Sequence, residues 1–256
     1  MNQPAAQINL RFHFHNGLED LLPAAQRSGQ VQMVCAPHQS IKHLVEALGI
    51  PHTEVGQMCL NGQPAADLFL AAAGLALKDG DRLDVYPYGR APLPAGGARF
   101  VLDNHLGRLA IYLRMLGCDS LYRNDYQDEE LAQVASSEGR ILLTRDRRLL
   151  MRKSVLYGYC VRHKDPPRQL AEVVLRYDLP CQASPFQRCL RCNHPLRPVP
   201  KAEVLERLEP LTRQYFDEFH LCPACNQVYW KGSHYEHMLG MIQELIKKGK
   251  PEQDER

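Results

Sequence analysis

Arg140-Ile-Leu-Leu-Thr-Arg-Asp146 decides the fold class of this chain, because it is a short apolar run that ends on a carboxylate. The same design occurs earlier in the chain, in Phe100-Val-Leu-Asp103. A short apolar run bounded by polar residues is consistent with a buried strand. The two stretches therefore predict two strands of one sheet, each with an acidic residue at its end.

The sequence around these strands alternates helical with extended patterns. Apolar residues recur at helical spacing over 105–116 and stop at Gly117, a common helix terminator. A short strand is predicted at 120–122, a second helix at 128–137 and a further strand at 155–162. This alternation predicts a parallel sheet with right-handed crossovers, in which ligand sites gather at the carboxyl ends of the strands.

Asp103 and Asp146 are the predicted centre of a metal site, since both would end strands at the same edge of the sheet. Converging carboxylates repel one another unless a cation lies between them, and Mg²⁺ or Mn²⁺ prefers oxygen ligands and retains bound waters. Two such ions can stabilise the attacking and the leaving oxygen in phosphodiester hydrolysis. The alternative role for each Asp is to cap the helix that follows it.

A third acidic ligand is needed for this chemistry, and the start of the second predicted helix offers the nearest ones. Asp128 and Glu129 are the favoured candidates, and Asp125 follows closely. Acidic residues also favour the first turn of any helix through its dipole, so each of them has an ordinary structural explanation. Asp165, which follows the last predicted strand, is a weaker candidate. The predicted catalytic residues are Asp103, Asp146, Asp128 and Glu129.

The middle of the chain is basic: residues 99–201 hold 18 Lys and Arg against 11 Asp and Glu, a net charge of +7. An excess of this kind suits a polyanion such as a nucleic acid. Guanidinium groups bind phosphates bidentately, although they can equally pair with acidic side chains or lie on a solvated surface. The arginines predicted to contact substrate are Arg108, Arg114, Arg145 and Arg147.

Two Cys-x-x-Cys pairs lie downstream and are separated by 29 residues. This spacing is expected of a zinc ribbon, in which two turns supply four thiolates to one tetrahedral ion. Four sulfurs leave no open position for water, so we expect the zinc to be structural. Tyr229 and Trp230 follow the second pair and could stack on a base or pack in the ribbon core. The predicted zinc ligands are Cys189, Cys192, Cys222 and Cys225.

The N-terminal segment has the pattern of a small sheet domain. Residues 8–14 alternate apolar with polar, a second strand is predicted at 31–35, and Ser40 is suited to cap a helix over 41–48. A final strand is predicted at 82–86. This order resembles the ubiquitin-like β-grasp fold, in particular its small sulfur-carrier branch. Because a carrier needs a free Gly-Gly terminus and this chain continues, we interpret the segment as a docking module for a protein partner.

Three motifs resemble the Mut-seven-C ribonuclease family. They are Asp103-Asn-His-Leu-Gly-Arg-Leu-Ala-Ile-Tyr-Leu-Arg-Met-Leu-Gly117, Ile141-Leu-Leu-Thr-Arg-Asp-Arg147 and Arg188-Cys-Leu-Arg-Cys-Asn193. That family combines a PIN-like nuclease domain with a zinc ribbon, often after a ubiquitin-like domain, and the resemblance covers nearly the whole chain in the same order. It implies a three-layer α/β/α fold, with Asp103 and Asp146 at the acidic positions of a PIN domain, and metal-dependent RNA cleavage.

Composition and motif order together predict the domain organisation. The absence of a long apolar run and of a signal-peptide pattern leads us to expect a cytoplasmic protein with no membrane segment. The odd count of nine cysteines also fits a reducing compartment. The predicted parts are a β-grasp domain at 1–90, a linker at 91–98, a PIN-like domain at 99–183, a zinc ribbon with a C-terminal helix at 184–248, and a polar tail at 249–256.

The predicted function is a metal-dependent ribonuclease that hydrolyses RNA at a Mg²⁺ or Mn²⁺ site, with single-stranded RNA held by the Arg-rich surface and the ribbon. Two alternatives stay open. A catalytically silent RNA-binding adaptor would show salt-sensitive binding without turnover. A sulfur-carrier-like partner protein would require processing to a free Gly terminus.

Overall fold

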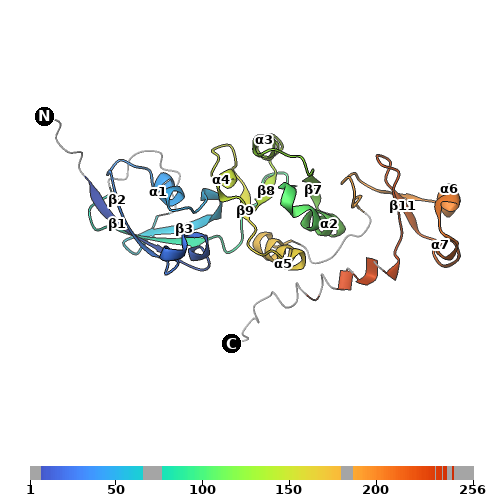
Figure 1. Ribbon diagram of the computed structural model, residues 1–256, viewed down its shortest axis with the longest axis horizontal. Helices are drawn as coiled ribbons and strands as arrows, with labels where there is room; N and C mark the ends of the chain where they lie inside the picture. The colour runs from blue at the N-terminus through green and yellow to red at the C-terminus, as the bar shows by residue number, and fades with distance from the viewer. Residues whose placement is uncertain are drawn as a thin grey trace. The chain divides into compact units, whose positions relative to one another are not determined.

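The computed structural model describes residues 7–65, 77–179, 187–233, 235–237, 239–240 and 244 (Figure 1). The chain forms two compact units. The first contains Met1–Ala91 together with Asp146–Cys160, and the second contains Pro92–Arg145 together with Val161–Arg256. A segment from the middle of the sequence is therefore part of the N-terminal unit. The domain limits given above stay predictions.

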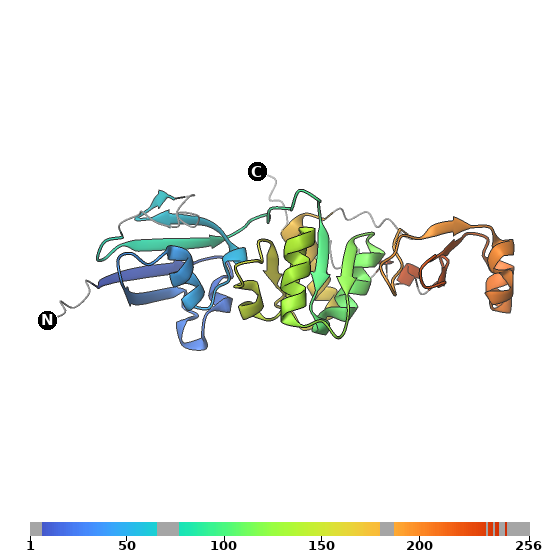
Figure 2. The same ribbon diagram turned by 90° about the horizontal axis from the view of Figure 1, so that it is seen from above.

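A five-stranded mixed sheet forms the body of the first unit, in the order β2-β1-β5-β3-β4 (Figure 2). β1 pairs antiparallel with β2 and parallel with β5. Alternate side chains of β1 are buried, so the period-2 prediction of this strand is confirmed. The strand bounds are β1 Ile8–Phe14, β2 Gln30–Cys35, β3 Val55–Leu60, β4 Gln63–Pro64 and β5 Arg82–Pro87.

Helix α1 (Ile41–Ala47) begins after Ser40, whose hydroxyl accepts a hydrogen bond from the amide of His43 at 3.3 Å. The predicted helix and its cap are thus confirmed. Asn61 and Gly62 both have positive φ and join β3 to β4, as a two-residue hairpin turn requires. Short 3-10 turns complete the unit: η1 Glu19–Leu21, η2 Ala24–Gln26 and η3 His52–Glu54.

The second sheet has four strands in the order β7-β6-β8-β9, and β6 pairs in parallel with β7 and β8. The chain moves from β6 to β7 and then back past β6 to β8, so right-handed crossovers require the two connecting helices to lie on opposite faces. Accordingly, α3 contacts β6 and β8, while α2 and α5 pack together on the other face (Figure 1). The predicted mixed α/β architecture with a parallel sheet is confirmed. The bounds are β6 Arg99–Leu102, η5 Asn104–Leu106, α2 Gly107–Met115, β7 Asp119–Tyr122, α3 Asp128–Glu138, β8 Ile141–Thr144, α4 Arg147–Leu150, β9 Gly158–Cys160 and α5 Pro166–Tyr177.

Helix α5 (Pro166–Tyr177) was not predicted from the sequence. Asp165 caps it, because its Oδ2 accepts a hydrogen bond from the amide of Arg168 at 3.3 Å. Pro166 is the first helical residue, where its missing N–H and fixed φ are favourable. The dipeptide Asp165-Pro166 is thus a start signal that was present in the sequence, and it gives Asp165 a capping role.

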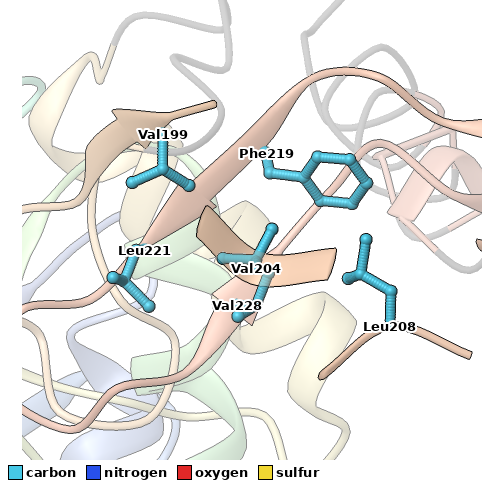
Figure 3. Close-up of a cluster of buried hydrophobic side chains, with 6 residues drawn as sticks. All are labelled: Val199, Val204, Leu208, Phe219, Leu221 and Val228. Atoms are coloured by element: carbon cyan, nitrogen blue, oxygen red, sulfur yellow. The ribbon is translucent and has the colours of Figure 1, made fainter. Parts of the chain in front are cut away.

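A third sheet, ordered β10-β11-β12 and antiparallel, lies within the second unit. This sheet and the two Cys-x-x-Cys turns beside it are called the ribbon below. Its core is the cluster of six apolar side chains in Figure 3, against which Phe216 and Trp230 pack. The elements are β10 Arg197–Val199, α6 Lys201–Val204, η6 Leu205–Arg207, α7 Pro210–Tyr215, β11 Phe219–Leu221 and β12 Val228–Tyr229. The predicted C-terminal helix that ends at residue 248 falls largely outside the described residues, and the tail at 249–256 falls entirely outside them. Among the helices that are described, none has the length and apolar character to cross a membrane.

Candidate functional site

Asp103 directly follows β6, and its carboxylate is held by the neighbouring strand. Its Oδ2 accepts a hydrogen bond from Thr144 Oγ1, at the end of β8, at 2.6 Å. Its Oδ1 accepts one from the Asn104 amide, also at 2.6 Å, so the residue caps η5 as well. Asp103 is only 9% exposed. The carboxylate is therefore fixed at the carboxyl ends of β6 and β8, where the strand order reverses and where sheets of this type bind ligands.

Asp146 follows the last residue of β8 by two positions and is exposed. Its Oδ1 accepts a hydrogen bond from the Arg148 amide at 2.8 Å, so the side chain caps α4. The capping role that the sequence left open is present. A carboxylate has two oxygens with two lone pairs each, so capping leaves acceptor capacity for a metal ion.

The acidic residues near the start of α3 are not gathered into a cluster. Asp128 and Glu129 are exposed in its first turn. Asp125 is bound bidentately by Arg123 at 2.9 and 3.0 Å, and this guanidinium lowers the pKa of the Asp125 carboxyl below its ordinary value. Among the described residues, only cysteines form a group of three or more metal-ligating side chains with neighbouring ligand atoms. The third acidic ligand therefore stays a prediction.

The four arginines predicted to bind substrate have two different environments. Arg108 and Arg145 are exposed. Arg147 instead donates from Nη1 to the carbonyl of Leu21 in the N-terminal sheet domain. Arg114 is only 4% exposed and donates to main-chain carbonyls. The structure thus leaves Arg108 and Arg145 accessible to a phosphate, while Arg114 and Arg147 have structural partners.

The four predicted zinc ligands do come together: all their Sγ atoms lie within 4.8 Å of one another. Cys189 Sγ lies 3.5 Å from Cys225 Sγ, and Cys192 Sγ lies 3.4 Å from Cys222 Sγ. A tetrahedral ion with Zn–S bonds of about 2.3 Å places its sulfurs about 3.8 Å apart, so these separations fit a Cys₄ zinc site. The cluster could hold a structural zinc ion.

Each Cys-x-x-Cys pair is followed by an Asn in the left-handed conformation, with φ of 68° at Asn193 and 58° at Asn226. The amide of Asn193 donates to the Cys189 carbonyl at 2.9 Å, and the amide of Asn226 donates to the Cys222 carbonyl at the same distance. Asn tolerates this conformation better than other non-glycine residues. The repeated Cys-x-x-Cys-Asn pattern was a sequence signal for two matching turns, here called the first and second knuckles (residues 189–194 and 222–227).

The hydroxyl group of Tyr229 contacts two residues of the first knuckle. Its Oη lies 3.1 Å from Cys189 Sγ and accepts a hydrogen bond from the Leu190 amide at 3.1 Å. Burial by itself would raise the pKa of the Cys189 thiol, but hydrogen bonds from Tyr229 and from knuckle amides outweigh burial and lower that pKa to about 7. Because zinc binds the thiolate, this environment favours Cys189 as a ligand, whereas burial raises the pKa values of the Cys192 and Cys225 thiols.

The first knuckle is joined to β7 by the side chain of Asn193. Its Oδ1 accepts a hydrogen bond from the Ser120 amide at 3.0 Å, and its Nδ2 donates to Asp119 Oδ1 at 2.7 Å. Asp119 also accepts a hydrogen bond from Arg140 Nη1 at 2.8 Å and forms an ion pair with Arg188 Nη2 at 3.3 Å. Burial would raise the pKa of Asp119, but hydrogen bonds from Arg140 and Asn193 outweigh it and lower that pKa. The ribbon is thus fastened to the parallel sheet by a buried polar network.

Arg114 makes the second connection between the sheet and the first knuckle. Its Nε donates to the Ser120 carbonyl at 2.9 Å, and its Nη1 donates to the Leu190 and Arg191 carbonyls at 2.8 and 3.1 Å. Its burial lowers its pKa, and the nearby Cys189 thiolate partly opposes this effect. A zinc ion with four thiolates carries a net charge of −2, which would provide the countercharge that a buried guanidinium needs.

In the first unit, the N-terminal sheet domain holds the Asp146–Cys160 segment. The Cys160 amide donates to Glu54 Oε1 at 2.6 Å, and Glu54 is fully buried. His52 Nε2 lies 2.8 Å from the Val155 carbonyl, while its Nδ1 lies 2.7 Å from Glu46 Oε1. Together with the contact of Arg147, these interactions make the chain after Asp146 an integral part of the N-terminal unit.

Three features characterise this protein: a parallel α/β domain with acidic residues after its strands, a four-cysteine ribbon, and an N-terminal mixed sheet. Residues 98–242 match the family model of the Mut7-C RNAse domain, and residues 7–92 match that of the Mut7-C ubiquitin domain. The chain belongs to the Mut7-C RNase family, which confirms the resemblance and indicates a nuclease-like role. Comparison with curated proteins found no match, and comparison with solved structures found none.

Proposed function

We propose that this chain is a metal-dependent ribonuclease of the PIN type, which hydrolyses single-stranded RNA at a Mg²⁺ or Mn²⁺ ion bound by Asp103 and Asp146. The observation that carries the proposal is the position of Asp103, whose carboxylate is fixed by Thr144 where β6 and β8 end. The family match supports RNA as the substrate. The ribbon would then stabilise the domain, and the ubiquitin-like domain would offer a surface to a protein partner in the cytoplasm.

The residues present fit one hard cation. Mg²⁺ is commonly held by one or two carboxylates, with waters and substrate phosphates completing the shell. Oδ1 of Asp103 accepts a hydrogen bond from the Asn104 amide and Oδ2 accepts one from Thr144, and a carboxylate oxygen has a second lone pair that can bind an ion. When bound, the ion would lower the pKa of a bound water and stabilise charge on the scissile phosphate. Asp128 and Glu129 stay the proposed further acids.

Two accessible arginines are suited to orient the RNA strand. Arg108 lies at the start of α2, five positions after Asp103, and Arg145 directly follows Thr144. Both are exposed, so a phosphate can approach either guanidinium and accept two hydrogen bonds from it. They would hold the phosphates on either side of the bond to be cleaved.

The test is cleavage of a labelled single-stranded RNA by the full chain with Mg²⁺ or Mn²⁺. Asp103→Asn and Asp146→Asn should each reduce cleavage to the level seen without divalent metal, with folding and zinc content unchanged. Asp217→Asn is the matched control, because Asp217 is an exposed acid that pairs with Lys201 on the ribbon. Undiminished cleavage in both active-site variants would refute the proposal. Salt-sensitive RNA binding without cleavage under any metal would favour the silent adaptor.

A further inference from the structure

A cavity of about 250 Å³ lies between the end of α2 and the ribbon, within the second unit. Met115 contributes from α2, Leu190 from the first knuckle, and Tyr229 and Trp230 from β12 and the residue after it. Leu190, Tyr229 and Trp230 each remain half-exposed, so the cavity opens to solvent. It is smaller than the roughly 300–1,000 Å³ typical of sites for drug-sized ligands, and it is suited to a single ring system.

The lining has a distinct chemical character. Aromatic and aliphatic side chains predominate, and the charged residues among the lining residues that the structure describes are Arg114 and Arg188, with no Asp or Glu. Both arginines already have partners, Arg114 in the Leu190 and Arg191 carbonyls and Arg188 in Asp119, so the lining favours a flat apolar group. An unpaired nucleobase is such a group, and bases stack readily on aromatic side chains.

The walls of the cavity are held in place before any ligand binds. Tyr229 is fixed by its contacts with Cys189 and Leu190, so its ring cannot turn freely. Gly232 leaves space for the indole: a Cβ at this position would lie 3.0 Å from Trp230 Nε1. Such preorganisation reduces the entropic cost of binding.

The cavity is connected to the acidic edge of the sheet by α2. This helix begins four residues after Asp103 and ends at Met115 in the cavity wall. Nine helical residues span about 13 Å. The exposed Arg108 lies on the same helix. A strand that enters the cavity can therefore run along α2 toward Asp103, with a few nucleotides between the two points.

We propose that this cavity binds one unpaired base of the RNA strand, with the base against Trp230. The proposal rests on the proposed function and adds a substrate subsite that lies away from the metal site. It makes the ribbon a part of substrate recognition in addition to its structural role. A single-stranded substrate follows from it, because a base within a duplex cannot enter.

Trp230 is the only tryptophan in the chain, so fluorescence excited selectively at the indole reports on this one residue of the cavity wall. The experiment uses the full zinc-loaded chain carrying Asp103→Asn and Asp146→Asn, titrated with a single-stranded oligoribonucleotide. A strand with abasic sites and a blunt duplex of the same sequence serve as comparison probes. We expect saturable quenching by the single strand, and binding at least ten-fold weaker for the abasic strand and the duplex.

A second measurement uses fluorescence anisotropy of labelled RNA. Trp230→Leu should weaken binding about ten-fold, whereas Trp230→Phe, which keeps an aromatic ring, should restore most of the affinity. Tyr215→Leu is the matched control, because Tyr215 is 68% exposed on α7 of the same ribbon and does not line the cavity. Zinc content and thermal melting check that each variant is folded.

The outcomes separate this proposal from the ribonuclease proposal. Quenching by the base-containing strand, with no cleavage by the unmodified chain, would support the subsite and refute the nuclease. Equal binding of the abasic strand, or RNA cleavage without any quenching, would overturn the subsite. Quenching by an apolar peptide but not by RNA would assign the cavity to a protein partner and overturn it as well.

Discussion

Glu54 accepts a hydrogen bond from the amide of Cys160 at 2.6 Å, across 106 positions of sequence. The carboxyl group belongs to the ubiquitin-like domain, and the amide ends the segment that begins at Asp146. Because Glu54 is fully buried, this contact is not a loose surface interaction. The ubiquitin-like domain therefore stabilises the part of the chain in which one of the two proposed metal ligands lies.

Replacing Glu54 tests that relationship. Glu54→Ala leaves the Cys160 amide without its carboxylate partner, and a buried amide without a partner costs about 1–3 kcal/mol. Urea denaturation of the full chain should show this loss, and hydrogen exchange should show faster exchange over residues 146–160. Asp20→Ala, at an exposed acid of the same domain, serves as the control. Unchanged exchange over 146–160 would contradict the stabilising role.

Asn193 and Asn226 occupy the same position in the two knuckles and form a matched pair. Glycine also adopts positive φ, so Asn→Gly removes the side chain while it keeps the turn. Asn193→Gly should destabilise the second unit by about 1–3 kcal/mol, because Ser120 and Asp119 lose buried hydrogen bonds. Asn226→Gly, at the exposed residue of the second knuckle, should change stability by less than about 0.5 kcal/mol. Equal effects in denaturation experiments would show that the network does not fasten the ribbon.

The pH dependence of stability should report on Asp119. Its pKa in the folded chain lies below the ordinary value of 3.8, since hydrogen bonds from Arg140 and Asn193 outweigh its burial. A carboxyl with a depressed folded pKa stabilises the fold above its unfolded pKa, and this contribution is lost as pH falls through the folded pKa. Wild type should therefore exceed Asp119→Asn in stability at pH 7, and the difference should shrink below about pH 4. Any zinc held by the four cysteines would be lost from both proteins at low pH, so only their difference is compared.

Thr144 should position the carboxylate of Asp103. Thr144→Val keeps the shape of the side chain but removes the 2.6 Å hydrogen bond, whereas Thr144→Ser keeps the hydroxyl. Loss of an interaction that orients a ligand commonly weakens metal binding about 10- to 100-fold. Titration with Mn²⁺, followed by electron paramagnetic resonance, should therefore show weaker binding to Thr144→Val and near-normal binding to Thr144→Ser. Equal binding by both variants would argue against Asp103 as a ligand.

Local patterns predicted much of the fold and of the candidate site. The apolar runs before Asp103 and near Asp146 placed both residues after adjacent parallel strands, and the cysteine spacing predicted the Cys₄ group. The roles of Arg114 and Arg147 could not be read in this way. Arg114 donates to the carbonyl of Leu190, 76 positions away, and Arg147 donates to the carbonyl of Leu21, 126 positions away. Only the tertiary fold shows which carbonyls these arginines reach. An arginine in a basic segment has the same local pattern whether it faces solvent or a buried carbonyl.

The bonds that Ser120 makes to the ribbon have a consequence for solubility. β7 is the outer strand of the parallel sheet, and an outer strand with free amides and carbonyls is a template for association with another chain. Asn193 occupies the Ser120 amide and Arg114 occupies the Ser120 carbonyl, so a foreign strand cannot pair at this point. If the first knuckle unfolds, for example when its cysteines hold no metal, this protection is lost. The exposed edge of β7 can then pair with a strand of another chain, which leads to aggregation.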